Sequence, residues 1–191
     1  MEKEFWKPGN MVYPLPAVMV SCGIYGKRPE DRNILTVAWT GTVCTNPAMA
    51  YISVRPERHS YHIIKERGEY VINLTTEALA RATDYCGVKS GATVDKFKAC
   101  GLTPGKAQVV EAPLILESPV NIECKVTDIL ELGSHHMFLS EVVGVNVDSS
   151  YMDEKGRFDL NRAGLLIYSH GEYYGLGEML GTFGYSVRKK K

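Results

Sequence analysis

The chain of 191 residues lacks several features that mark whole classes of proteins. Neither charge sign is in excess, with 22 Lys and Arg against 22 Asp and Glu, whereas nucleic-acid-binding proteins normally carry surplus positive charge. No stretch approaches the roughly 20 apolar residues of a membrane-spanning helix, and the opening MEKEFWKPGN has no apolar signal core. We therefore expect a cytoplasmic protein that binds neither nucleic acid nor membrane.

Cysteine is scarce and its spacing is unremarkable. The five residues, at positions 22, 44, 86, 100 and 124, are an odd number without a Cys-x-x-Cys pair, which favours reduced, mostly buried thiols over a disulfide framework. His135 and His136 are adjacent, and adjacent strand residues point to opposite faces. We expect no metal site there or elsewhere.

Two common site patterns are also missing. Gly175, Gly177 and Gly181 depart by one residue from the Gly-x-Gly-x-x-Gly fingerprint, and no strand-turn-helix pattern surrounds them. No Ser-His-Asp or Cys-His constellation is evident, so we assign no catalytic side chain. With 45% hydrophobic and 23% charged residues, the chain is expected to form one globular domain over residues 1–191.

The sequence does contain a series of short β-branched segments. We predict strands at residues 17–24, 34–45, 49–54, 69–74, 120–127 and 137–147, and a short buried run at 163–168. Gly133 and Ser134 mark a hairpin turn between the last two strands. Apolar and polar residues alternate at 120–127, which predicts a half-exposed strand with Asn121 and Glu123 on its polar face.

Helical patterns are few and short. Residues 60–67 read as a helix with Ser60 capping its first turn and Gly68 ending it, and further helices are expected at 77–85 and 93–100. Strands and helices do not alternate regularly. The pattern is typical of a mainly β protein, a closed antiparallel barrel with short helical insertions. The basic residues 188–191 are expected to be a hydrated chain end.

Residues 53–61 are the first candidate site, because a strand end there delivers cations and hydroxyls to the start of a helix. Arg55 offers a planar guanidinium, and the first turn of a helix has unpaired N–H groups, so the segment suits a phosphate group. The alternative is that Arg55 and Arg58 are solvated charges and Ser60 is only a helix cap.

Residues 36–42 are the second candidate site. Threonines flank Trp39 and Gly41 on one strand, and such a surface suits a flat heteroaromatic ring, whose edge backbone groups and hydroxyls can pair. The alternative is a threonine-rich strand with a tryptophan in the core.

A set of segments along the chain carries a family resemblance: residues 33–39 with Asn46-Pro47, 53–61, 68–73, 173–178 and 184–186. Together these segments resemble the flavin reductase-like family, most closely its flavoredoxin branch. The resemblance implies an FMN-binding split barrel, with short helical insertions, that forms a homodimer with flavin near the subunit boundary. It also implies a set of cofactor-binding residues: Thr36, Val37, Ala38, Trp39, Thr40 and Thr42 along the ring, Ser53, Val54, Arg55 and Ser60 toward the phosphate, and Lys89 with Ser90 reaching the cofactor.

The function implied is FMN redox chemistry, as a flavoredoxin-like electron carrier or an NAD(P)H:flavin oxidoreductase. Lys89 would then stabilise the reduced ring. Alternatives are a non-catalytic FMN-binding module that stores flavin or senses redox state, and an interaction protein that has lost its flavin. NADH, NADPH and a redox protein such as ferredoxin all stay open as electron donors, as do FAD in place of FMN and a flavin contact for His170.

Overall fold

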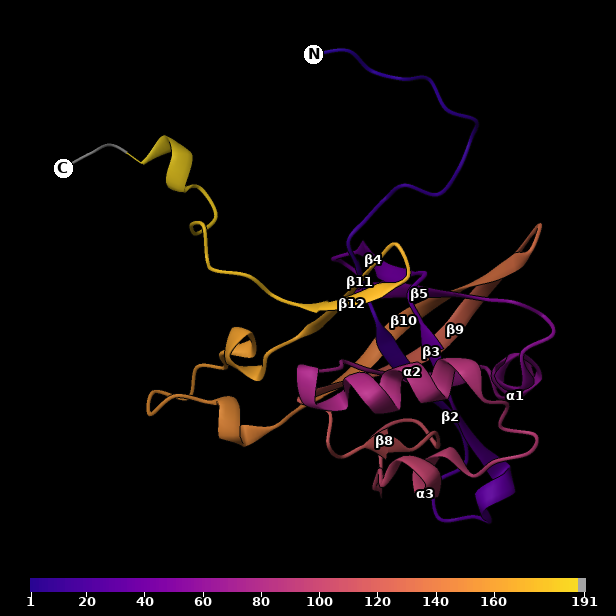
Figure 1. Ribbon diagram of the computed structural model, residues 1–191. Coiled ribbons are helices and arrows are strands. Elements are labelled where there is room, and N and C mark those ends of the chain that lie inside the picture. Colours follow the sequence, from indigo (N-terminus) through magenta and orange to yellow (C-terminus); the bar gives the residue numbers. More distant parts are fainter. Residues whose placement is uncertain (189–191) are drawn as a thin grey trace.

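One seven-stranded antiparallel sheet dominates the computed structural model, which describes residues 1–188 (Figure 1). The basic residues 189–191 lie outside the described part. The strand order of the seven-stranded sheet is β3-β2-β6-β9-β10-β5-β4. The strands are β2 (Val18–Gly23), β3 (Arg32–Val37), β4 (Thr40–Cys44), β5 (Met49–Val54), β6 (Glu69–Asn73), β9 (Val120–Leu132) and β10 (His135–Val147). The mainly β, antiparallel fold class is confirmed.

The two edge strands of this sheet, β3 and β4, are consecutive in the chain. Only Ala38 and Trp39 separate them, and the Thr40 N–H donates to the Ala38 carbonyl at 3.0 Å, while the Ser53 N–H donates to the Trp39 carbonyl at 2.8 Å. A two-residue link holds both edges within a few ångströms, so the sheet must curl on itself. β3 and β4 do not pair, so the barrel is split rather than closed, and the single strand expected at 34–45 is wrong.

The core fills both faces of the curled sheet. Inside lie residues from five strands and helix α1 (His59–Arg67): Val20, Leu35, Val37, Ile52, Val54, Ile64, Tyr70, Ile72 and Phe138. Helices α2 (Ala80–Val88) and α3 (Lys96–Cys100) cover the outer face, where Met19, Ile34, Phe97 and Ile115 pack together. Because both faces are covered, β2 is buried throughout and β6 nearly so, rather than alternating.

Helix ends differ from expectation at α1 and α2. Arg58, and not Ser60, is the N-cap of α1, and Ser60 lies fully buried inside the first turn. α2 runs through Gly87 to Val88 after a 3-10 turn at Glu77–Leu79. Gly68 ends α1 as predicted, because its φ of 67° suits a residue without a Cβ.

Asn121 and Glu123 are buried, so the polar face predicted for β9 is wrong at its first half. The segment with β7 (Pro104–Gly105) and β8 (Leu114–Ile115) covers this face. The Glu123 carboxylate accepts the backbone N–H groups of residues 108–110 at 2.7–3.0 Å and Asn146 Nδ2 at 2.8 Å. Burial acts to raise the pKa of Glu123, but these hydrogen bonds outweigh it and hold the pKa below its ordinary value.

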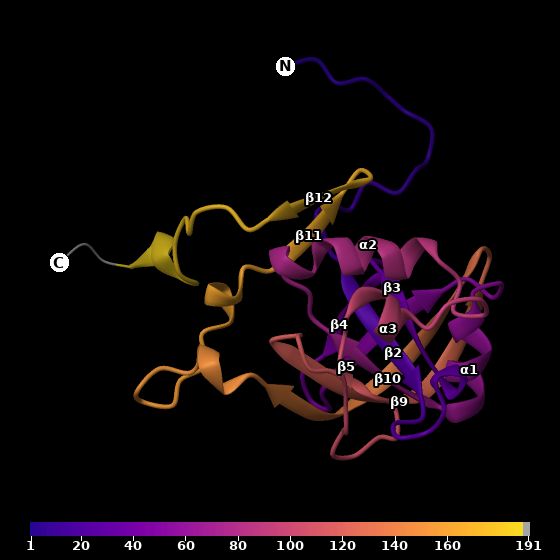
Figure 2. The ribbon, with the colours of Figure 1, turned by 60° about the horizontal axis from the view of Figure 1, so that its bottom comes forward.

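A second, three-stranded sheet lies near α2 (Figure 2). It consists of β1 (Leu15–Pro16), β11 (Leu166–Ser169) and β12 (Glu172–Gly175). Short 3-10 helices occupy Pro29–Asp31, Ser149–Tyr151, Leu160–Ala163 and Tyr185–Val187. None of the helices within residues 1–188 has the length and apolar character needed to cross a bilayer.

Both ends of the chain extend away from the body as arms, residues 1–14 and 176–188 (Figures 1 and 2). These arms hold exposed large apolar side chains: Phe5, Trp6, Met11, Met179, Leu180 and Phe183. A single copy of the chain leaves this apolar surface in water, which is unfavourable.

Candidate functional site

Two adjoining cavities open beside the crossover between β3 and β4. The first has a volume of about 270 Å³ and is lined by the end of β3, the crossover, the end of β5, α2 and the β11–β12 hairpin. The second has a volume of about 210 Å³ and lies between the start of α1 and the segment after α2. Leu35, Arg55, Arg58 and Val88 line both. The two cavities therefore form one continuous groove.

Aromatic rings line the first cavity. Trp39 stacks on His135 with ring centroids 5.9 Å apart and planes 6° apart, and Tyr168 meets Tyr173 edge to face at 5.7 Å. Burial lowers the pKa of His135, and the nearby Arg55 charge lowers it further, which favours the neutral imidazole. This end of the groove offers flat aromatic walls suited to a planar ring, and Arg55, Arg58 and Asp84 complete its lining.

Helix α2 is held closely against β3 at this cavity. The Thr36 hydroxyl donates to the Thr83 carbonyl of α2. A Cβ at Gly87 would lie only 3.2 Å from Thr36 Cβ, so glycine permits this approach. The Arg58 guanidinium donates to the Gly87 carbonyl at 3.0 Å and joins the start of α1 to the end of α2. The walls of the groove are thereby fixed by contacts between three elements.

Four cations line the second cavity: Arg55, Arg58, Lys89 and Lys96. The Lys96 residue is 3% exposed, and its Nζ donates to the carbonyls of Ile34 and Cys86, each at 2.7 Å. Burial lowers the pKa of Lys96, and within residues 1–188 it forms no ion pair with a carboxylate. A buried cation without a counter-charge favours an anion beside it.

Asn33 and Gly91 shape the floor of the second cavity. Asn33 Nδ2 donates to Ser60 Oγ at 2.8 Å, and the Cys22 thiol also lies within hydrogen-bond reach of this hydroxyl. A Cβ on Gly91 would overlap the Asn33 side chain. Glycine is therefore required for the segment after α2 to approach β3.

Most of the site residues predicted from the sequence lie along this groove. The first cavity is lined by Thr36, Val37, Ala38, Trp39, Ser53, Val54 and Arg55, and the second by Arg55, Ser60, Lys89 and Ser90. Thr40 and Thr42 line neither cavity, because the chain turns before them. The Thr40 hydroxyl donates to the Tyr51 carbonyl at 2.7 Å, and Thr42 is exposed on β4.

Several groove residues escaped sequence reasoning. Lys96 comes from α3, and Tyr168 comes from the distant β11–β12 hairpin, so only the tertiary fold brings them to the groove. Tyr173 belongs to the tail tyrosines, for which the sequence left a flavin contact open, and it lines the first cavity. The sequence pattern marks His135 only as a possible metal ligand. A local signal did exist for Arg58, which stands beside Arg55 in the phosphate candidate.

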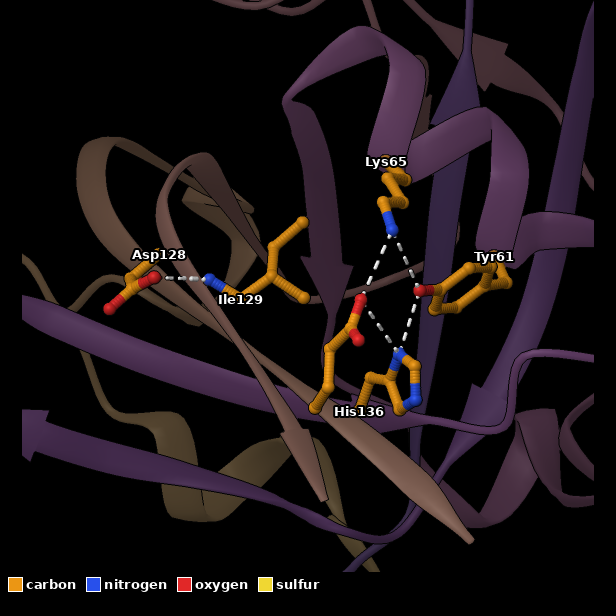
Figure 3. Close-up of polar contacts among 6 residues, drawn as sticks. Tyr61, Lys65, Asp128, Ile129 and His136 are labelled. Carbon is orange, nitrogen blue, oxygen red and sulfur yellow. Dashed lines mark hydrogen bonds and ion pairs between the residues drawn. The ribbon is translucent and has the colours of Figure 1, made fainter. Parts of the chain in front are cut away.

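His135 and His136 point to opposite sides of β10, as predicted. His136 Nδ1 lies 2.7 Å from the Tyr61 hydroxyl, and Lys65 Nζ reaches both that hydroxyl, at 3.4 Å, and Glu131, at 3.3 Å (Figure 3). This cluster fastens α1 to the β9–β10 hairpin on the side away from Trp39. It is a structural contact between elements.

Comparisons with known proteins agree with this architecture. The family model described as "Flavin reductase like domain" matches residues 11–177. The structure of a flavoredoxin from Desulfovibrio vulgaris (Miyazaki F) superposes with a TM-score of 0.87 and 32% identity, over 98% of this chain and 100% of that one. A flavoredoxin from Methanosarcina acetivorans gives 0.86 and 25%, over 98% and 100%. An uncharacterized protein of Archaeoglobus fulgidus is 28% identical over 174 residues, 91% of this chain and 94% of its own length.

Proposed function

The chain belongs to the flavin reductase-like family, and from this premise we propose that it binds FMN and acts as a flavin-dependent redox protein. The observation that carries the proposal is the two-ended groove, in which aromatic rings line one end, Lys89 and Lys96 line the other, and Arg55 and Arg58 line both. FMN has the matching division, a planar tricyclic ring and a phosphate dianion. When bound, the flavin supplies hydride and single-electron chemistry that the side chains of the groove lack.

The cationic cavity suits the phosphate. Arg55 and Arg58 stand at the start of α1, where the helix dipole favours an anion, and the buried Lys96 has no carboxylate partner within residues 1–188. The Ser60 hydroxyl, whose oxygen accepts from Asn33, lines the same cavity and is a further donor for the phosphate. These groups would hold a dianion more tightly than a neutral substituent.

The aromatic cavity suits the ring. The backbone of residues 36–39 runs along one wall and can pair with polar atoms at the ring edge, while Trp39, Tyr168 and Tyr173 exclude water. Lys89 lines the second cavity directly after Val88, which lines both, and is the cation that we assign to stabilising negative charge on the reduced ring. The protein's own role is positioning and electrostatics.

Two roles fit this site, a flavoredoxin-like electron carrier and an NAD(P)H:flavin oxidoreductase. The purified chain should turn yellow with FMN and quench its fluorescence at one site per chain. Steady oxidation of NADH or NADPH with added flavin would establish the reductase, and reduction by ferredoxin alone would establish the carrier. A chain that binds FMN but accepts electrons from none of these donors would be a flavin store or sensor. A chain that ignores FMN would refute the proposal.

A homodimer is the further part of this proposal. The arms, residues 1–14 and 176–188, hold exposed apolar side chains and leave the body at the small sheet that contains β11 and β12 (Figure 2). Tyr168 of β11 and Tyr173 of β12 line the first cavity. A second copy of the chain can cover them and add walls to the groove, which a single copy leaves open on one side. Light scattering of the purified chain should therefore give twice the mass of one chain.

A further inference from the structure

Two cysteines meet where α2 contacts α3, behind the cationic cavity. Cys86 Sγ and Cys100 Sγ lie 3.9 Å apart. All five cysteines are free, and among residues 1–188 no other two sulfur atoms lie within hydrogen-bond reach. A disulfide needs a sulfur separation of about 2.05 Å, so side-chain rotation and a small helix shift would join this pair.

The two thiols differ in access. Cys86 is fully buried beside Met19 and Phe97, and burial raises its pKa to about 12. Cys100 is half-buried and lines a surface groove of about 280 Å³ together with Arg81 and Tyr85. A small reagent therefore reaches Cys100 first, and Arg81 offers a cation to a reagent that carries carboxylates.

We propose that Cys86 and Cys100 form a reversible disulfide by exchange with a small acidic disulfide. The Cys100 thiolate attacks one sulfur of the reagent, RS–SR, and expels RS⁻, which leaves a mixed disulfide on Cys100. Cys86 then gives up its proton and attacks the Cys100 sulfur, expelling the second RS⁻. The protein loses two S–H hydrogens, the reagent gains them as two RSH, and the two electrons pass to the reagent.

Proximity compensates for the poor acidity of Cys86 in the second step. Once the mixed disulfide forms, Cys86 has its target beside it, so the reaction is intramolecular and needs only a small fraction of thiolate. The expelled thiol leaves through the open groove at Cys100. The buried thiol is thus the resolving one, and the accessible thiol is the attacking one.

The pair brackets residues 89–96, which include Lys89, Ser90 and Lys96 of the cationic cavity. Lys96 Nζ also donates to the carbonyl of Cys86 itself. Drawing the sulfur atoms together by about 2 Å must therefore disturb this wall of the cavity. This consequence rests on the proposed function: oxidation should weaken FMN binding at least about fivefold.

The test uses oxidised glutathione on the folded chain, in a background with Cys44→Ser. Cys44 is half-buried on the edge strand β4, away from both cavities, and its removal avoids a second reactive thiol. Mass spectrometry after acid quenching should show the loss of two hydrogens without attached glutathione, and peptide mapping should join Cys86 to Cys100. Adding Cys86→Ser should leave one glutathione on Cys100, and adding Cys100→Ser should leave all thiols unreacted.

Three outcomes would overturn the site: unreacted thiols, glutathione that persists on Cys100 while Cys86 is present, or a link that forms only in urea. Because these measurements need no flavin, they stand whether or not FMN binds. FMN titration of the reduced and oxidised chain then tests the coupling, and equal affinities would refute it. A chain that binds FMN in neither state would count against the proposed function, not against the disulfide.

Discussion

Replacing Arg55 by alanine is expected to weaken the binding of FMN much more than that of riboflavin. Arg55 lines both cavities, and its side chain is 50% exposed and paired with Glu57 at 3.3 Å. A hydrogen bond between charged groups contributes ~1.5–3 kcal/mol, which corresponds to a change in Kd of about 10- to 150-fold. Because solvent screens the charge of a half-exposed group, we expect Arg55→Ala to raise the Kd for FMN by about 10- to 30-fold, the lower end of that range.

Riboflavin lacks the phosphate, so it isolates the interaction of interest. Titrating both flavins into wild type and Arg55→Ala, followed by quenching of flavin fluorescence, gives the coupling between the guanidinium and the phosphate directly. Riboflavin affinity should change less than about threefold. Arg28→Ala is the matched control, because Arg28 is exposed, pairs with Glu30 and Asp31 and lines neither cavity. Equal losses for both flavins, or no loss for FMN, would refute the placement of the phosphate.

Three other changes probe the cavity floor, the buried carboxylate and the arms. Gly91→Ala should displace the Asn33 side chain, lower the free energy of unfolding by about 1–3 kcal/mol and weaken FMN binding. Gly133→Ala is the control, because a Cβ there meets open space, and it should change neither stability in urea unfolding nor affinity in flavin titration. Glu123→Gln should lower the free energy of unfolding by about 1–3 kcal/mol at pH 7. Because hydrogen bonds lower the pKa of Glu123 from 4.5, the carboxylate stabilises the fold fully above pH 4.5, and this stabilisation is lost as the pH falls through the lowered pKa. The melting temperatures of variant and wild type should therefore converge in acid, and a constant difference between them at all pH values would contradict this. Deleting the arm from residue 176 onward should turn the dimer into a monomer in light scattering, and a full chain that is already monomeric would refute that role.

Strand positions could be predicted well where local chemistry decides them. β5 occupies the predicted residues 49–54, and Gly133 with Ser134 forms the turn between β9 and β10. β-branched residues and turn formers act through the local backbone, so their signal survives without knowledge of the fold. Gly68 is a similar case, since a left-handed residue at the end of a helix favours glycine in any context.

Errors arose where long-range packing decides the outcome. The alternation at Asn121 and Glu123 is real, but the segment around β7 and β8 folds over that face, and buried hydrogen bonds replace water. Lys96 likewise has no local mark of a site residue. Its burial follows from the docking of α3 on the sheet, which a one-dimensional pattern does not contain.

The crossover at Ala38 and Trp39 explains why the opening of the barrel and the candidate site coincide. Had β3 and β4 paired, their edges would have satisfied each other, and the backbone of residues 36–39 would have had nothing to offer a ligand. Because the chain turns instead, β3 stays an edge strand bonded only to β2. α2 covers part of that edge, and the Lys96 amine donates to its Ile34 carbonyl. The remainder of the β3 edge borders the first cavity. The turn at Ala38 and Trp39, which the sequence pattern did not predict, therefore leaves residues 36–39 at the first cavity, where we propose that the flavin ring binds.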